Sequence, residues 1–60
     1  MKVTITYKDS KREQDKFDCD LWTIDKQNSL FKLFKKTENR IPFKPNVLIR
    51  LPEILKIEIV

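Results

Sequence analysis

The sequence predicts an all-β protein, a small five-stranded antiparallel barrel or half-barrel formed as a single domain by residues 1–60. Apolar side chains recur at every second position in residues 3–7, 47–51 and 55–59, which is the period of a half-buried strand. Pro52 separates the last two of these runs, because proline lacks the N–H that a strand ladder needs. Short β-rich segments that end in strand, tight turn, strand are typical of small antiparallel barrels.

The first predicted strand covers residues 3–7, where Val3, Ile5 and Tyr7 share one face. Residues 9–16, DSKREQDK, contain no apolar side chain. They therefore predict an exposed hairpin loop with solvated charges.

The second predicted strand covers residues 17–24, and its apolar side chains divide between two faces. Phe17, Cys19 and Leu21 fall on one face, and Trp22 and Ile24 fall on the other. This change of phase predicts a β-bulge near Leu21–Trp22, and a strand with both faces covered is the alternative. Residues 25–29 then supply a turn, in which Asn28 can adopt positive φ in a chain without glycine.

Residues 28–36 are compatible with two structures. Leu30, Phe31, Leu33 and Phe34 have helical spacing, which allows a short helix with Asn28 or Ser29 as N-cap. In a strand, Phe31 and Leu33 would instead face the core, with Lys32 in solvent. We favour the strand, because a helix of two turns is marginal on its own and the neighbouring segments are β.

Pro42 and Pro45 make residues 40–45 a connector without a regular ladder, in which Ile41 and Phe43 are expected to cap the core. The last two strands are predicted at 47–51 and 55–59. Their inward-facing residues are expected to be Val47, Ile49 and Leu51 in the first, and Leu55, Ile57 and Ile59 in the second.

A chain of this length buries only about 60% of the surface that its unfolded form exposes, so its margin of stability is thin. Cys19 is the single cysteine and there is no histidine, so neither an intrachain disulfide nor a zinc site is available. Self-association is the remaining source of stability. The apolar last strand, with Leu55, Ile57, Ile59 and Val60, is its expected contributor.

The stretch LIRLPEILKIEIV, together with the earlier strands and TIDKQNSLFKLFKK, resembles the small barrels of the Src-homology-3-like and Sm-like type. The opening KVTITYKD also resembles short uncharacterised proteins of Gram-positive phages and mobile elements. These resemblances cover most of the chain as a pattern of strands and transfer no functional residue. They imply a 3₁₀ turn between the last two strands and a phage or mobile-element origin. The chain lacks the glycines that small barrels use at sharp bends.

No catalytic, cofactor or metal site is predicted, and the chain is not expected to be an enzyme. Asp18 and Asp20 lie on the strand face opposite Cys19, so the three groups do not converge, and no histidine is present to activate the thiol. Asp15, Asp18, Asp20 and Asp25 do not have the spacing of a calcium loop, which also requires a glycine.

Two sets of residues are candidates for binding. The first is a set of exposed cations for nucleic acid, next to phenylalanines that can stack on bases: Lys32, Lys35, Lys36, Arg40, Lys44 and Arg50. Core phenylalanines and lysines that protect strand edges explain the same pattern without a ligand. The second set, for a protein partner, is Trp22, Phe31 and Phe34. Trp22 is equally compatible with an interface anchor and with a core side chain.

The expected function is therefore that of a non-enzymatic interaction protein, phage or mobile-element encoded, that self-associates and binds a host or viral protein. A small nucleic-acid-binding barrel is the alternative, and the net charge of +4 is compatible with an anionic partner. The sequence contains no apolar run long enough to span a membrane and no signal peptide, so no membrane contact is expected. The single thiol fits the cytoplasm, which is that of the host cell if the protein is phage encoded.

Overall fold

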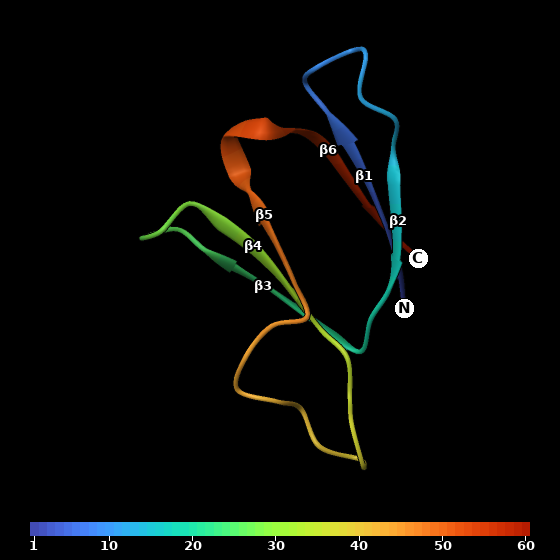
Figure 1. Cartoon of the computed structure of the whole chain (residues 1–60), viewed down its shortest axis with the longest axis vertical. Coiled ribbons are helices and arrows are strands. Elements are labelled where there is room, and N and C mark those ends of the chain that lie inside the picture. Colours follow the sequence, from blue (N-terminus) through green and yellow to red (C-terminus); the bar gives the residue numbers. More distant parts are fainter.

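The computed structural model describes all 60 residues and shows an all-β protein with two three-stranded antiparallel sheets (Figure 1). Sheet A has the strand order β2-β1-β6, and sheet B has the order β3-β4-β5. The strands are β1 (Lys2–Tyr7), β2 (Asp15–Asp18), β3 (Leu21–Asp25), β4 (Leu30–Phe34), β5 (Val47–Arg50) and β6 (Ile54–Ile59), with a 3₁₀ turn, η1 (Leu51–Glu53), before β6. The predicted all-β class and 3₁₀ turn are confirmed. The chain has six strands instead of five, however, and its two sheets do not close into a barrel.

The sixth strand arises because the second predicted strand divides between the two sheets. The Cys19 backbone N–H donates to the Met1 carbonyl at 2.9 Å, which extends the pairing of sheet A. The next N–H, that of Asp20, donates to the Phe34 carbonyl at 2.9 Å and so belongs to sheet B. The change of phase in the sequence therefore marks a crossing between sheets, and the predicted bulge near Leu21–Trp22 is wrong.

A bulge does occur, but in β6. The pairing of β1 with β6 changes register between Thr6 and Tyr7, so that Leu55 has no opposite residue on β1. The extra residue turns Ile54 toward the core, beside the half-buried Ile57. The prediction that Leu55 faces inward is therefore wrong, and 66% of its surface is exposed.

The buried core contains side chains from β1, β4 and β5 and one from the crossing between the sheets: Val3, Ile5, Tyr7, Cys19, Phe31, Leu33 and Ile49. The alternation predicted for residues 3–7 is confirmed by this set, and that for 47–51 by the buried Ile49 with the partly buried Val47 and Leu51. Residues 30–34 form a strand with Phe31 and Leu33 inside, so the helix considered for 28–36 does not form. Apart from Cys19, every buried core side chain comes from a strand, and the longer connecting loops contribute no buried side chain.

The turn between β3 and β4 is built around Asp25. Its carboxylate accepts hydrogen bonds from the backbone N–H and the side-chain amide of Asn28, at 3.1 and 2.9 Å, and the Lys32 ammonium lies 3.1 Å away. These hydrogen bonds, those of Asn28 first, lower the pKa of Asp25 to about 2. The residue with positive φ in this turn is Ser29, at 55°, and not Asn28 as the sequence suggested.

Candidate functional site

The first candidate surface lies on the inner face of β3, at the edge of sheet B, and consists of Trp22 and Ile24. Their opposite residues on β4 are the buried Leu33 and Phe31, yet 37% of Trp22 and 45% of Ile24 remain exposed. Figure 1 shows that the end of β3 and its turn project away from sheet A. We call Trp22 and Ile24 the β3 patch.

The aromatic side chains predicted to bind a partner do not form one surface. The ring of Phe31 is fully buried and supports the Trp22 ring from the core side, with the centroids 5.9 Å apart and the rings tilted by 42°. Phe34 is opposite Leu21 on the outer face of the sheet, away from Trp22. Trp22 is therefore partly a core residue and partly a surface residue, and only it and Ile24 are available to a partner on this face.

The six cations predicted to bind nucleic acid are also divided by the fold. Lys32 is held by Asp25, and Arg50 is opposite Leu30 at the far end of β4. The other four, which take part in none of the five ion pairs of the structure, lie in the loop of residues 35–46 between β4 and β5: Lys35, Lys36, Arg40 and Lys44.

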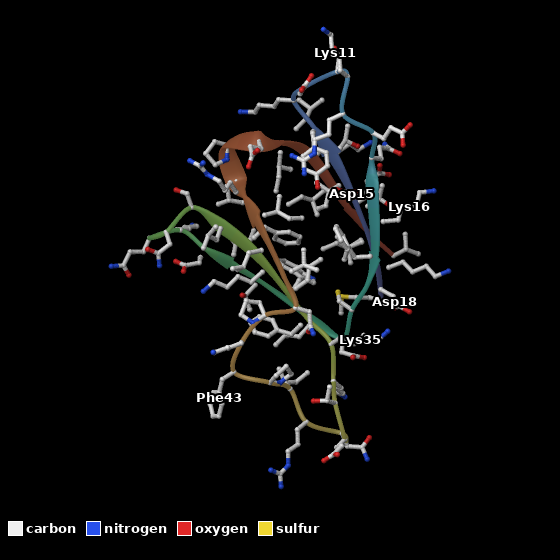
Figure 2. The ribbon with its side chains drawn as sticks, viewed as in Figure 1. Lys11, Asp15, Lys16, Asp18, Lys35 and Phe43 are labelled. Carbon is white, nitrogen blue, oxygen red and sulfur yellow. The ribbon has the colours of Figure 1, made fainter.

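The 35–46 loop is anchored at its base and leaves Phe43 in solvent. The Lys35 backbone N–H donates to the side-chain oxygen of Asn46 at 2.6 Å, and the Asn46 backbone N–H donates to the Leu33 carbonyl at 2.8 Å. The chain between these anchors extends beyond the end of the core, and Phe43 points away from the body of the molecule (Figure 2). The prediction that Phe43 caps the core is wrong, because its ring is fully exposed.

The far end of this loop is a tight backbone turn. Thr37 and Arg40 exchange two backbone hydrogen bonds, each 2.9 Å long. Between them, Glu38 and Asn39 have φ of 51° and 63°, the left-handed pair that a two-residue type I′ hairpin turn requires. Sequence analysis missed this turn, because Glu-Asn is not among the usual dipeptides of such a turn and only Asn39 signals positive φ.

A cluster of charges at the opposite end of the molecule is compensated internally. The Tyr7 hydroxyl donates to an Asp15 carboxylate oxygen at 2.6 Å, and the Arg12 guanidinium carbon lies 3.6 Å from the centroid of the Tyr7 ring. Arg12 is also 3.6 Å from Glu53 and 3.9 Å from Asp15. Burial, and then the hydrogen bond to Asp15, raise the pKa of Tyr7. The loop predicted to be merely solvated is thus joined to β1, β2 and η1.

The Asp18, Cys19 and Asp20 segment shows no convergent chemistry. Cys19 is buried at the crossing between the sheets, and its burial raises the pKa of its thiol. Asp20 accepts a hydrogen bond from the Lys36 backbone N–H at 2.7 Å, so it anchors the start of the 35–46 loop. No group of three or more Cys, His, Asp or Glu side chains in the structure is arranged to hold a metal ion. The structure has no helix with the length and apolar character needed to cross a membrane.

Comparisons with protein families, with curated proteins and with solved structures find no match for this chain. The resemblance to Src-homology-3-like and Sm-like barrels stays a prediction from the strand pattern.

Proposed function

We propose that this chain is a non-enzymatic interaction protein that associates with itself and binds a second protein through the β3 patch. The observation that carries the proposal is the exposure of Trp22 and Ile24 on a sheet face whose other side chains are buried or, at Val47, half-buried. Its resemblance to phage and mobile-element proteins leads us to propose a host or viral protein as the partner. We also propose an opened form of the small barrels as its fold type, which the strand crossing and the 3₁₀ turn support.

The β3 patch has the properties of an interface anchor. Tryptophan is enriched among the residues that carry binding energy. Its contribution is largest when neighbouring side chains already hold its ring in place. Here the Phe31 ring holds Trp22 from the core side, so little side-chain freedom is lost when a partner covers it. The free edge of β3 also leaves backbone groups available to a partner strand.

The test uses Trp22 as both target and reporter, because it is the only tryptophan in the chain. Proteins captured from a host lysate are compared between the wild type, Trp22→Ala and Thr23→Ala, the last being a matched change on the other face of the same strand. Once a partner is purified, Trp22→Ala should weaken its binding by about 2 kcal/mol, or roughly 30-fold, with little effect of salt. Binding should also shift the Trp22 fluorescence to shorter wavelength. Equal binding by Trp22→Ala and the wild type, with both folded, would exclude the β3 patch.

A second candidate function, binding of single-stranded nucleic acid, is favoured by the 35–46 loop. It combines four cations that form no ion pair with one fully exposed aromatic ring, Phe43. Phosphates attract such cations, and a free aromatic ring stacks on a base of any sequence. The tip of the loop, Glu38 and Asn39, is polar, so insertion of this loop into a membrane is the weaker explanation.

For this second function, the affinity for a single-stranded oligonucleotide should fall with salt, with a log–log slope approaching about −0.7 per phosphate contact. Reversal of Lys35 and Lys36 to Glu should abolish binding, and Phe43→Ala should weaken it. The matched control reverses Lys8 and Lys11 to Glu, which changes the net charge equally. Lys11 lies at the opposite end of the molecule (Figure 2), and Lys8 belongs to the same loop, directly after β1. Equal losses from the two double reversals would indicate attraction to net charge alone.

A further inference from the structure

The free edge of β6 has a feature that no other edge strand shares. It carries opposite charges two residues apart, Lys56 and Glu58, whose side chains approach within 3.6 Å on the outer face of sheet A. It also has large apolar side chains on either side of them, with 66% of Leu55 and 40% of Ile59 exposed. On β2, Lys16 and Asp18 provide opposite charges, but no large apolar side chain is exposed there. The edge strands β3 and β5 contain no such pair of charges.

The hydrogen bonds of β1 with β6 show which backbone groups of β6 are free. Lys2 and Val60 exchange both of their backbone hydrogen bonds, at 3.1 and 2.9 Å. In an antiparallel ladder such pairs alternate along the strand, so Glu58 also turns its N–H and C=O toward β1. Ile57 and Ile59 therefore direct theirs to the open edge, where no strand of this chain pairs.

We propose that two copies of this chain pair antiparallel along β6, with Ile57 of one copy opposite Ile57 of the other, to form a continuous six-stranded sheet. This inference rests on the self-association in the proposed function and specifies its geometry. The free groups of the two Ile57 residues hydrogen-bond to each other, and the two-fold axis passes between them.

The charges of β6 select this register over its neighbours. Centred on Ile57, the pairing puts Lys56 of each copy opposite Glu58 of the other, so two opposite-charge pairs form. Centred on Lys56 or on Glu58, it would put like charges directly opposite, which is destabilising. The Ile57 register also brings Leu55 of each copy against Ile59 of the other, which removes the exposed apolar surface at this edge from water.

The first experiment is a charge swap, read as the dimer dissociation constant by sedimentation and light scattering over a dilution series. Lys56→Glu and Glu58→Lys should each weaken the dimer about tenfold or more, because each change creates two like-charge pairs. The double variant that carries both changes should restore the affinity of the dimer, because opposite charges again face each other between the copies, with their positions exchanged. Lys16→Glu, Asp18→Lys and their double variant are matched controls on β2, and they should have no effect.

The second experiment tests register by cross-linking. Lys56→Cys chains mixed with Glu58→Cys chains should form an intermolecular disulfide, because directly opposite residues of this kind lie about 4.5 Å apart at Cα. Each variant alone should form much less. Both substituted positions are exposed and Cys19 is buried, so neither folding nor the native thiol interferes.

The outcomes separate the inference from the proposed function. A chain that stays monomeric at all concentrations overturns both the self-association and its geometry, while partner binding through the β3 patch is tested separately. A dimer whose dissociation constant does not change with the β6 charge swap, and whose Cys variants form no intermolecular disulfide, overturns only the geometry. A dimer that responds to the β2 swap instead places the pairing at the other edge of sheet A.

Discussion

The two charged loops of this protein, residues 8–14 and 35–46, lie at opposite ends of the molecule and are held in different ways (Figure 2). In the first, Arg12 stacks on Tyr7 and lies between the carboxylates of Asp15 and Glu53. In the second, the side-chain cations have no acidic partner, and the loop is held by hydrogen bonds of its backbone, two of which the side chains of Asn46 and Asp20 accept. A charged loop thus becomes part of the fold or remains available for a ligand according to the distant residues that reach it.

The largest difference is expected between the aromatic side chains of the two ends. Tyr7→Ala removes a buried ring and should cost about 3 to 5 kcal/mol of unfolding free energy. Phe43→Ala removes an exposed ring and should cost within about 0.5 kcal/mol. Urea unfolding followed by circular dichroism measures both. Since a chain of this size can unfold on losing Tyr7, Tyr7→Phe provides a milder variant, with an expected cost of about 1 kcal/mol for the hydrogen bond to Asp15. Similar costs at Tyr7 and Phe43 would contradict the comparison.

The next effect concerns the backbone of the 35–46 loop. Asn39→Val places a β-branched residue at φ of 63°, which should cost about 1 to 2 kcal/mol. Gln27→Val is the control, since Gln27 is exposed in the turn between β3 and β4 and does not have positive φ. Denaturant unfolding of the two variants compares them directly. Equal unfolding free energies for the two variants would show that the backbone at Asn39 is not held at positive φ.

A smaller effect separates the two arginines. Arg12→Ala loses the contact with the Tyr7 ring and two exposed ion pairs, for a total of about 1 kcal/mol. Arg40→Ala leaves the backbone bonds of Arg40 intact, so stability should change by less than about 0.5 kcal/mol. Thermal unfolding of both variants in low and high salt checks the difference. Loss of stability in Arg40→Ala would show that its side chain has a partner within the fold.

Much of the fold was predictable because apolar and polar side chains alternate along single strands. The inward faces of β1 and β5 and the break at Pro52 each follow from a few neighbouring residues. The strand at β4 was chosen over a helix only from its length and its β neighbours. The division of β2 from β3 does not, because it depends on Met1 and Phe34, which accept hydrogen bonds from Cys19 and Asp20 across the chain. The bulge at Leu55 likewise depends on the pairing of β6 with β1. The sequence of β6 alone does not decide whether Leu55 or Ile54 faces the core.

The candidate site was predictable only in part, for a related reason. Trp22 was identified from its side-chain type, whereas Ile24, near the end of an edge strand and 45% exposed, was not identified. Phe31 and Phe43 are the same residue type, but the ring of Phe31 is buried and the ring of Phe43 is exposed. Exposure of an aromatic side chain is set by which sheet covers it, and that is not a local property.

The smallest expected effect is the pH dependence of the stability that Tyr7 contributes, at the end of the molecule that also holds Arg12 and Asp15. The folded protein raises the pKa of Tyr7 above its ordinary value of 10.0, so it favours the protonated hydroxyl. This contribution to stability is fully present below about pH 10, the unfolded value, and is lost as the pH rises through the higher folded value, because the phenolate beside Asp15 is both buried and repelled. Tyr7→Phe has no group to ionise, so the difference in unfolding free energy between it and the wild type should shrink above pH 10. Lysine deprotonation affects both proteins alike and cancels in that difference. A difference that stays constant through this range would show that the hydroxyl of Tyr7 ionises as easily in the folded chain as in the unfolded one, and that this end of the molecule is as open to solvent as the 35–46 loop.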